Sequence, residues 1–210
     1  MEKIAGVILA GGLSRRMGGG DKALRALNGK PLVGHVIERL HEQADPIVLN
    51  ANGDPSRFSA CGLSVIPDAT QDFAGPLAGV LAGLRWAATA APKVRFIVTA
   101  ACDTPFFPQD LVERLLGSID GTYPCVALAA SAGRTHPVFA LWPVALASDL
   151  ALSLEAGTRK VQDWTNRHPH FIAEFAFADF GGYLVDPFFN ANKPEELAEA
   201  ERLLTMGRMP

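Results

Sequence analysis

Glycines and cations crowd one short stretch near the start of the chain. Leu9 to Lys22 reads L-A-G-G-L-S-R-R-M-G-G-G-D-K, with five glycines, two arginines and a lysine. Glycines let backbone N–H groups point into a loop and let a ligand approach the main chain closely. Arg15, Arg16 and Lys22 add positive charge around the same loop, so the stretch predicts a cradle for polyphosphate. The alternative is a surface loop without a ligand, although turns seldom combine so many glycines and cations.

The spacing of this stretch excludes two better-known phosphate loops. A dinucleotide-binding fingerprint needs G-x-G-x-x-G, whereas Leu13 stands two places after Gly11. A P-loop needs G-x-x-x-x-G-K-S/T, whereas Met17 stands five places after Gly12 and Asp21 precedes Lys22. The polyphosphate hypothesis therefore rests on neither motif.

A carboxylate follows the clearest predicted strand of the chain. Val94 to Ala100 is a continuous apolar run, which predicts a central strand of a parallel sheet, and Asp103 comes shortly after it. Mg²⁺ is typically held by one or two carboxylates together with substrate phosphates, so Asp103 is a candidate magnesium ligand. The alternative is a helix cap, because Pro105 and Pro108 precede a helix predicted over residues 109–119.

Polar residues follow two other predicted strands. Asn50 and Asn52 follow a strand predicted over residues 46–49, and Asp68 follows one predicted over residues 63–67. Ligands of open α/β sheets bind beyond the carboxyl ends of the strands, so these side chains are placed to contact a nucleotide. An aspartate here could accept hydrogen bonds from the N–H groups of a nucleotide base. Turn chemistry explains the asparagines about as well, and Asp68 could instead be a solvated turn residue.

The elements that must position these residues alternate between strands and helices, which predicts the α/β class. Further strands are predicted over residues 4–9, 125–130, 137–142 and, at an edge, 171–177. Further helices are predicted over residues 31–44, 76–90, 144–154 and 158–167, and a last one opens near Pro194. On the helix of residues 76–90, Gly79 and Gly83 would allow close packing, which we expect against the sheet for Gly83.

Composition narrows the class of protein. The 210 residues are enough for one α/β domain, with little left for a second. A net charge of −3 gives no general attraction to nucleic acid, so the basic cluster indicates a local site. Three cysteines without C-x-x-C spacing fit a reducing cytosol. No apolar stretch predicts a membrane span or a signal peptide, and we expect a soluble, cytoplasmic protein.

The first loop, L-A-G-G-x-S-x-R-M-G-x-x-D-K, resembles the signature of sugar-nucleotide and cofactor nucleotidyltransferases. Within that superfamily the chain is most similar to the molybdenum cofactor guanylyltransferases. The resemblance runs almost end to end, through D-K-A-L at 21–24, N-A-N at 50–52, G-P-L-A-G at 75–79, C-D-T-P at 102–105 and F-x-N-x-N-x-P-E-E-L at 188–197. It implies a single Rossmann-like three-layer domain over residues 1–210 with a mostly parallel central sheet. Residues 1–105 or so would form the GTP and magnesium side, and residues 106–210 the molybdopterin side.

The resemblance also implies a reaction. GMP would pass from GTP to the phosphate of molybdenum-molybdopterin, releasing pyrophosphate in a Mg²⁺-dependent step. Such transfer needs in-line positioning and neutralisation of charge rather than covalent help from side chains. Arg15, Lys22 and Asp103 would be catalytic, with Asp103 as the metal ligand. GTP would be bound by Leu9, Ala10, Gly11, Gly12, Lys22, Asn50, Asp68, Gly75, Gly79 and Asp103.

Residues of the second half supply candidates for the molybdopterin side. Arg134 and His136 precede a predicted strand and could bind a phosphate or a pterin edge, although a lone histidine in a loop is as often surface decoration. Asn190 and Asn192 are expected to face the acceptor pocket. Arg159 and Lys160 add cations that the resemblance connects with the phosphate of the cofactor, and a solvated helix face explains them as well.

Other functions of the same fold remain open at this point. Gly11-Gly12 favours GTP only by family comparison, because related enzymes that transfer CMP to the same cofactor usually have L-A-A-G in the first loop. The acceptor could be a sugar phosphate or methylerythritol phosphate. A non-catalytic nucleotide sensor is a further alternative, against which Arg15, Lys22 and Asp103 argue. The expected substrates are GTP and molybdenum-molybdopterin. Molybdenum-insertion proteins, molybdoenzymes or their chaperones are expected partners that would receive the product.

Overall fold

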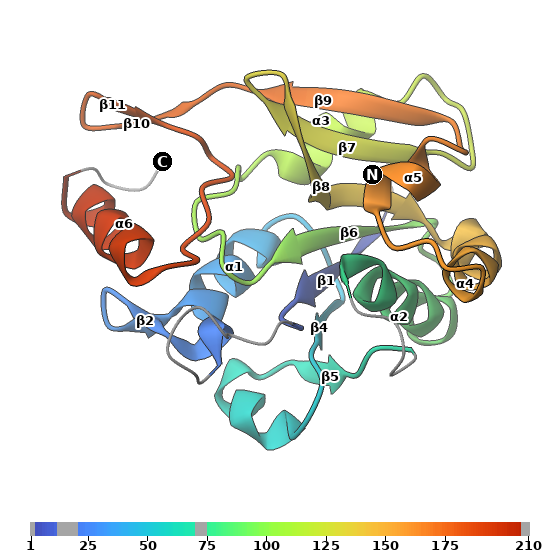
Figure 1. The fold of residues 1–210 in the computed structure, drawn as a ribbon, viewed down its shortest axis with the longest axis horizontal. Coiled ribbons are helices and arrows are strands. Elements are labelled where there is room, and N and C mark those ends of the chain that lie inside the picture. Colours follow the sequence, from blue (N-terminus) through green and yellow to red (C-terminus); the bar gives the residue numbers. More distant parts are fainter. Residues whose placement is uncertain (1–2, 12–20, 70–74, 207–210) are drawn as a thin grey trace.

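A seven-stranded sheet forms the centre of the protein in a computed structural model that describes residues 3–11, 21–69 and 75–206 (Figure 1). Its strands follow the order β5 (Ser64–Ile66), β4 (Ile47–Asn50), β1 (Ile4–Leu9), β6 (Phe96–Ala101), β8 (Arg134–Pro143), β7 (Val126–Ser131) and β9 (His170–Phe175). Neighbouring strands pair in parallel except that β8 is antiparallel to both β6 and β7. The mostly parallel sheet expected from the resemblance is confirmed, with β6 in its middle.

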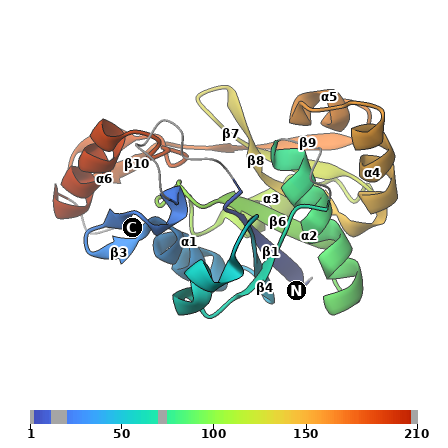
Figure 2. The same ribbon diagram turned by 60° about the horizontal axis from the view of Figure 1, so that its bottom comes forward.

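Helices cover both faces of this sheet and make three layers (Figures 1 and 2). One face packs on α1 (Leu32–His41) and α3 (Leu111–Gly117), and the other on α2 (Pro76–Ala90), α4 (Ala147–Glu155) and α5 (Val161–Thr165). Strand β1 shows why both layers are needed. Ile4 and Ile8 face the first helical layer while Ala5 and Val7 face the second, because side chains alternate along a strand. The α/β class predicted from the sequence is confirmed.

Helix α2 lies close to the sheet because it carries glycine where a side chain would collide. A Cβ atom added at Gly83 would lie 2.6 Å from Val7 Cγ2 and 3.1 Å from Ile97 Cδ1. Both distances are below ordinary van der Waals contact. The packing role predicted for Gly83 is therefore confirmed, and it brings the amino-terminal end of α2 near the ends of β1 and β4.

Two small hairpins and the last helix form a separate apolar cluster. The hairpins are β2 (Ala26–Leu27) with β3 (Lys30–Pro31) and β10 (Ala178–Phe180) with β11 (Tyr183–Val185), and the helix is α6 (Pro194–Met206). Leu27 and Leu32 from the beginning of the chain pack there with Phe180 and Leu203 from its end. The sequence analysis missed both hairpins, because strands of two or three residues are too short to show a hydrophobic period.

Several predicted boundaries are wrong in detail. The loop expected over residues 131–136 is a tight hairpin, in which only Ala132 and Gly133 lie between β7 and β8, with φ of +48° and +73°. Positive φ at both positions matches the turn that best fits the twist of paired strands. Arg134 and His136 therefore belong to β8. Among the described residues, no helix is long and apolar enough to cross a membrane.

Candidate active site

The ends of four strands bring the predicted nucleotide residues to one edge of the sheet. In the parallel register Leu9 at the end of β1 is level with Asn50 of β4 and with Ala101 of β6, and Asn50 is level with Ile66 of β5. Backbone hydrogen bonds continue past the strands, from Ala10 N to Asn50 O at 2.9 Å and from Cys102 N to Leu9 O at 3.1 Å. The first turn and C-D-T-P therefore leave the sheet side by side, where open α/β sheets bind ligands.

Lys22, Asp103 and Asn192 meet at this edge. The Lys22 ammonium donates to the Asp103 carboxylate and to Asn192 Oδ1. The side chains of Lys22 and Asp103 are each only 16% exposed, and partial shielding from water strengthens the attraction between their charges. Three motifs far apart in the sequence thus converge on one charged group.

Asp103 is also tied to the segment before α6 through its neighbours. The amide of Ala191 donates to the backbone carbonyl of Asp103 at 2.9 Å, and Thr104 Oγ1 donates to Asn190 Oδ1. Helix α3 begins only at Leu111, so Asp103 does not cap it and the helix-cap alternative is wrong. Asn192 thus touches Lys22, one of the residues expected to be catalytic, and Asn190 touches Thr104 beside Asp103. The expected place of both asparagines on the acceptor side stays a prediction.

Asn50 and Asp68 form a second polar group at the same edge. Asn50 is buried, and its amide donates to Asp68 Oδ1 at 3.0 Å and to Ile66 O at 3.3 Å. Asn52 donates to Asp68 Oδ2 at 2.7 Å and accepts from the Asp68 amide at 2.8 Å. These hydrogen bonds fix the Asp68 carboxylate, and each of its oxygens has a further lone pair for a ligand donor.

Gly79 and Gly11 surround the Asn50 side chain. A Cβ atom at Gly79 would lie 2.3 Å from Asn50 Oδ1 and 2.8 Å from Leu9 Cδ2, and one at Gly11 would lie 3.7 Å from Asn50 Oδ1. Gly75 precedes α2 with φ of +131°, a conformation that favours glycine. The structure thus brings Leu9, Ala10, Gly11, Asn50, Asp68, Gly75 and Gly79 to one region. Arg15 and Gly12 lie outside the described residues.

His136 belongs to a different group, formed with Ser131 and Asp186. Ser131 Oγ is 2.7 Å from His136 Nε2 and donates to Asp186 Oδ1 at 2.9 Å. The imidazole stacks on Phe188 at 4.4 Å between ring centroids. Burial lowers the pKa of His136, although Asp186 opposes that shift. Arg134 lies exposed at the start of β8.

The oxygen atoms at the sheet edge suit a hard cation whose coordination is completed by substrate phosphates. Within residues 3–11, 21–69 and 75–206, no group of three His, Cys, Asp or Glu side chains could by itself hold a metal. The Asp103 carboxylate and the oxygens of Thr104, Asn190 and Asn192 lie together, and oxygen is the ligand that Mg²⁺ prefers. Burial raises the pKa of the adjacent Cys102 thiol, which therefore stays protonated and packs as a core residue.

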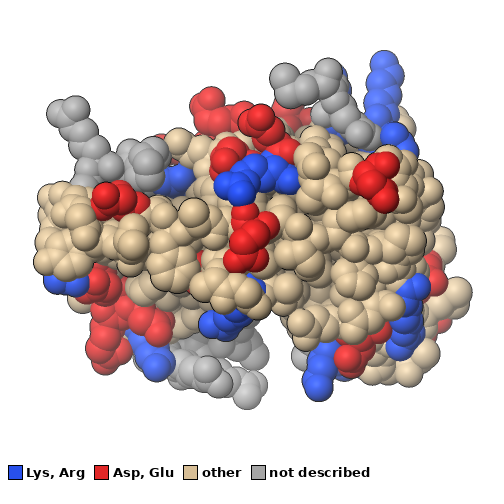
Figure 3. All heavy atoms as spheres, turned by 90° about the horizontal axis from the view of Figure 1, so that it is seen from above, with Lys and Arg blue, Asp and Glu red and all other residues tan. Residues whose placement is uncertain are grey.

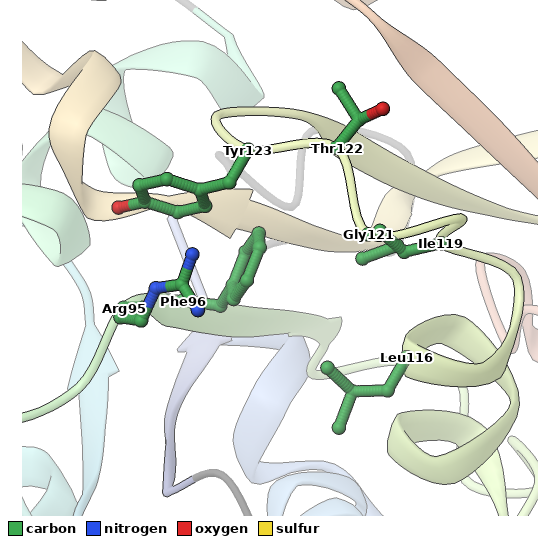
Figure 4. A pocket seen from close by; sticks show the side chains of 7 residues that line it. All are labelled: Arg95, Phe96, Leu116, Ile119, Gly121, Thr122 and Tyr123. Atoms are coloured by element: carbon green, nitrogen blue, oxygen red, sulfur yellow. The ribbon is translucent and has the colours of Figure 1, made fainter.

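Two hollows in the surface differ in how they lie relative to these groups. One, near the amino-terminal end of α2, is lined by Ala156, Gly157, Thr158, Arg159, Lys160, Asp163 and Arg167. It adjoins the nucleotide region, since a Cβ atom at Gly75 would lie 3.9 Å from Arg159 O. The other is at the opposite end of β6 from Asp103, where the Arg95 guanidinium lies 4.0 Å from the centroid of the Tyr123 ring (Figure 4). That second hollow is not part of the candidate site.

The surface charge of the protein is mixed on the face shown in Figure 3. Acidic and basic side chains are interspersed there among uncharged residues. This distribution agrees with the small net charge of −3. That the protein does not bind nucleic acid stays a prediction.

The sequence analysis missed three polar residues that the structure brings into these groups. Thr104 stands inside C-D-T-P, and the motif by itself predicts no separate role for it. Asp186 lies two residues before Phe188, where the last motif begins, and Asp-Pro is a turn signal that could have drawn attention to it. Ser131 gave no signal, because a serine in an apolar strand has no partner until the chain is folded.

Comparison with known proteins places this chain in a family. Residues 6–171 match the family described as the MobA-like NTP transferase domain. A molybdenum cofactor guanylyltransferase from Bradyrhizobium sp. is 51% identical over 204 residues, covering 97% of this chain and 94% of the relative. One from Rhodopseudomonas palustris is 52% identical over 198 residues, covering 94% and 92%.

Solved structures show the same fold. A molybdopterin-guanine dinucleotide biosynthesis protein A from Archaeoglobus fulgidus aligns with a TM-score of 0.73 and 22% identity, covering 96% of this chain and 99% of that one. The sequence relatives and the family model together are sufficient to assign the family. The chain belongs to the MobA-like NTP transferases, in the branch formed by proteins named molybdenum cofactor guanylyltransferase.

Proposed function

We propose that this protein transfers GMP from GTP to the phosphate of molybdenum-molybdopterin, giving the guanine dinucleotide form of the cofactor and pyrophosphate. The names of relatives about 50% identical over nearly the whole chain support this substrate pair. The observation that carries the proposal is the meeting of Lys22, Asp103 and Asn192 at the carboxyl edge of the sheet. A phosphate oxygen of the acceptor attacks the α-phosphorus, and the bond to pyrophosphate breaks.

The first half of the chain, about residues 1–105, would hold GTP and the metal. The segment formed by Leu9, Ala10, Gly11 and Gly12 would lie along the phosphates, with the Ala10 amide remaining bonded to Asn50 O at 2.9 Å rather than to the ligand. Arg15 and Lys22 would offset the charge of the leaving pyrophosphate. Gly75 and Gly79 would leave room for the nucleotide.

Asn50 and Asp68 would read the base. The two side chains hold each other through the hydrogen bond of 3.0 Å, so their orientation is set before the nucleotide arrives. A fixed carboxylate can accept from both N1 and N2 of guanine, whereas cytosine has no such pair of donors. This contact would explain a preference for GTP over CTP.

Mg²⁺ would be held by Asp103 together with the substrate phosphates. When bound, the ion neutralises charge on the reacting phosphate oxygens and so stabilises the transition state. Asp103 is suited to this task because its carboxylate follows the central strand at the edge of the sheet where the phosphates would lie.

The second half, about residues 106–210, would hold the acceptor. Asn190 and Asn192 would orient it next to Asp103, and Arg134 and His136 would contact its pterin or phosphate. Arg159 and Lys160 would provide further positive charge near the start of α2. We place the reaction in the cytoplasm, where the free thiols of Cys61, Cys102 and Cys125 persist, and expect delivery to molybdenum-insertion proteins, molybdoenzymes or their chaperones.

Pyrophosphate release tests the proposal directly. The purified protein is incubated with Mg²⁺ and each of the four NTPs, with and without molybdenum-molybdopterin. Release with GTP alone, and only with that acceptor, is the expected result. Release with CTP would show that the donor is CTP rather than GTP. Release with a sugar phosphate or methylerythritol phosphate would show that the acceptor is that compound rather than molybdenum-molybdopterin. If no pyrophosphate is released with any NTP and acceptor, the alternative of a non-catalytic nucleotide sensor is favoured.

A further inference from the structure

The segment Asp186–Asn192 connects the two polar groups of the site and is tied down at both ends. It lies between β11 and α6 and crosses from the end of β7 to the end of β6 (Figure 1). Its first residue contacts Ser131, and its last contacts Lys22. What holds this segment therefore decides where its asparagines lie.

The near end is held by one oxygen atom. Asp186 Oδ1 accepts hydrogen bonds from Ser131 Oγ and from the Phe188 amide, both at 2.9 Å. The backbone of the same residue accepts from the Phe189 amide at 2.9 Å, which closes a turn. Asp186 thus sets the direction in which the chain leaves for Asn190.

Ser131 provides the anchor for that oxygen. Its residue is only 1% exposed, so a lost hydrogen bond there could not be replaced freely by water. Because its hydroxyl proton points to Asp186, His136 Nε2 at 2.7 Å must be the donor to Ser131 Oγ. The Phe188 ring packs between His136 and Phe139, at 4.4 and 5.0 Å between centroids, and completes the anchor.

The far end delivers the polar side chains to the catalytic group. Ala191 is fully buried and donates through its amide to Asp103 O at 2.9 Å. On either side of it, Asn190 accepts from Thr104 and Asn192 accepts from Lys22. A shift of the segment by a fraction of an ångström would change both contacts at once.

We propose that Asp186 and Ser131 are positioning residues, which act through the segment Asp186–Asn192 to hold Asn190 and Asn192 against the acceptor. This inference rests on the proposed function, because it assigns the segment to acceptor binding. Neither residue touches the reacting atoms. Their contribution is to fix the acceptor side of the site, whereas the Asn50–Asp68 pair, which would bind the base of GTP, makes none of these contacts.

Three variants separate this role from general stability. Asp186→Ala removes the acceptor atom, and Ser131→Ala removes the hydroxyl that anchors it. Asp186→Asn keeps an oxygen in the place of Oδ1, so it should retain both hydrogen bonds and restore function. Asp179→Ala is the matched control. Asp179 also closes a turn, in the β10–β11 hairpin, where its Oδ1 accepts a hydrogen bond from the Gly182 amide at 2.6 Å.

Each variant is measured in three ways. Steady-state kinetics give kcat and the KM for molybdenum-molybdopterin, calorimetry gives the Kd for GTP, and hydrogen exchange reports the amides of Phe188 and Ala191. For Asp186→Ala and Ser131→Ala we expect kcat/KM for the acceptor to fall on the order of tenfold, with the Kd for GTP within about twofold of wild type. Exchange at both amides should accelerate, while Asp186→Asn and Asp179→Ala stay near wild type.

Two results would overturn the inference. One is unchanged exchange of the segment amides in Asp186→Ala and Ser131→Ala. The other is faster exchange of these amides without any change in kcat/KM for the acceptor. Faster exchange with a loss of GTP affinity as large as the loss in kcat/KM for the acceptor would count in the same way. If the wild-type protein transfers no GMP at all, the proposed function fails, and unchanged exchange would still separately show that Asp186 does not hold the segment.

Discussion

Lys22 and Asp103 stand 81 positions apart in the chain, yet their side chains form the charged centre of the candidate site. Each residue type was predictable because polyphosphate and Mg²⁺ demand cations and carboxylates. Their contact was not predictable from spacing, since it depends on β1 and β6 lying next to each other in the sheet. At the scale of the residue, the sequence therefore reveals the chemistry and the fold supplies the pairing.

Lys22→Ala tests the role of the cation. Turnover should fall on the order of a hundredfold, because the charge of the leaving pyrophosphate loses its partner. The melting temperature should change little, since a loop cation makes a small part of the core. Lys30→Ala is the matched control, because Lys30 pairs with Glu38 away from the sheet edge. A wild-type rate in Lys22→Ala would refute the polyphosphate role.

Asp103→Asn tests the metal ligand. The variant keeps the size of the side chain but loses the charge that a divalent cation needs. Magnesium-dependent turnover should drop at least a hundredfold while GTP still binds, as measured by a Mg²⁺ titration of the rate and by calorimetry. Asp110→Asn, in an exposed pair with Arg114, should behave as wild type. An unchanged magnesium dependence in Asp103→Asn would contradict the assignment.

At the scale of the element, helix α2 is held against the sheet by two glycines with different surroundings. Gly83 faces Val7 and Ile97, which are apolar, whereas Gly79 faces Asn50 and Leu9. The spacing of four predicted that both would lie on one face of the helix. Which one borders a polar side chain depends on where β4 ends, and this the sequence did not show.

Alanine substitutions should separate these two positions. Gly79→Ala and Gly83→Ala should each lower the free energy of unfolding by about 1–3 kcal/mol, because the new methyl group overlaps its neighbours. Only Gly79→Ala should also raise the KM for GTP, since it displaces Asn50. Gly117→Ala is the control, as no atom of the part of the chain that the structure describes lies within 4 Å of a Cβ atom there. Denaturant unfolding and GTP kinetics check the three variants, and an unaffected KM in Gly79→Ala would exclude Asn50 from nucleotide binding.

The strands and helices of the main sheet were predicted more successfully than the connections. Strand β6 and helix α2 were visible as an apolar run and as a helix opened by Pro76. The anchor of Ser131, His136 and Asp186 could not be predicted from the sequence. It joins strand β7, strand β8 and the segment after β11 through single hydrogen bonds. Short hairpins such as β2–β3 were missed for a related reason. Packing against α6, from the distant end of the same chain, stabilises them rather than local propensity.

At the scale of the whole molecule, buried histidines make stability depend on pH. Burial lowers the pKa of His35, whose Nε2 contacts Leu27 O at 2.9 Å and whose Nδ1 has no hydrogen-bond partner among the described residues. The unfolded chain thus binds more protons than the folded one below the ordinary histidine pKa of about 6.5. Stability is full above that pH and falls as the pH drops toward the lowered pKa, and His136 adds to the same trend.

Urea unfolding between pH 7.5 and 5 measures this dependence. The free energy of unfolding should decrease steadily below about pH 6.5. His35→Leu should be less stable at pH 7.5, because it loses the hydrogen bond to Leu27, but its stability should depend less steeply on pH. An equally steep dependence in wild type and His35→Leu would show that other groups account for it.

The contact between Lys22 and Asn192 spans 170 positions of the chain and has a consequence for synthesis. A ribosome adding about 5–20 residues per second emits Asn192 roughly 10–30 seconds after Lys22. Asp103 is added about halfway through that interval, and from then on the nascent chain holds the first loop and Asp103 but lacks the asparagines that complete their surroundings. The order of translation thus separates the residues proposed to bind GTP from those proposed to bind its acceptor, and only a nearly finished chain can join the two.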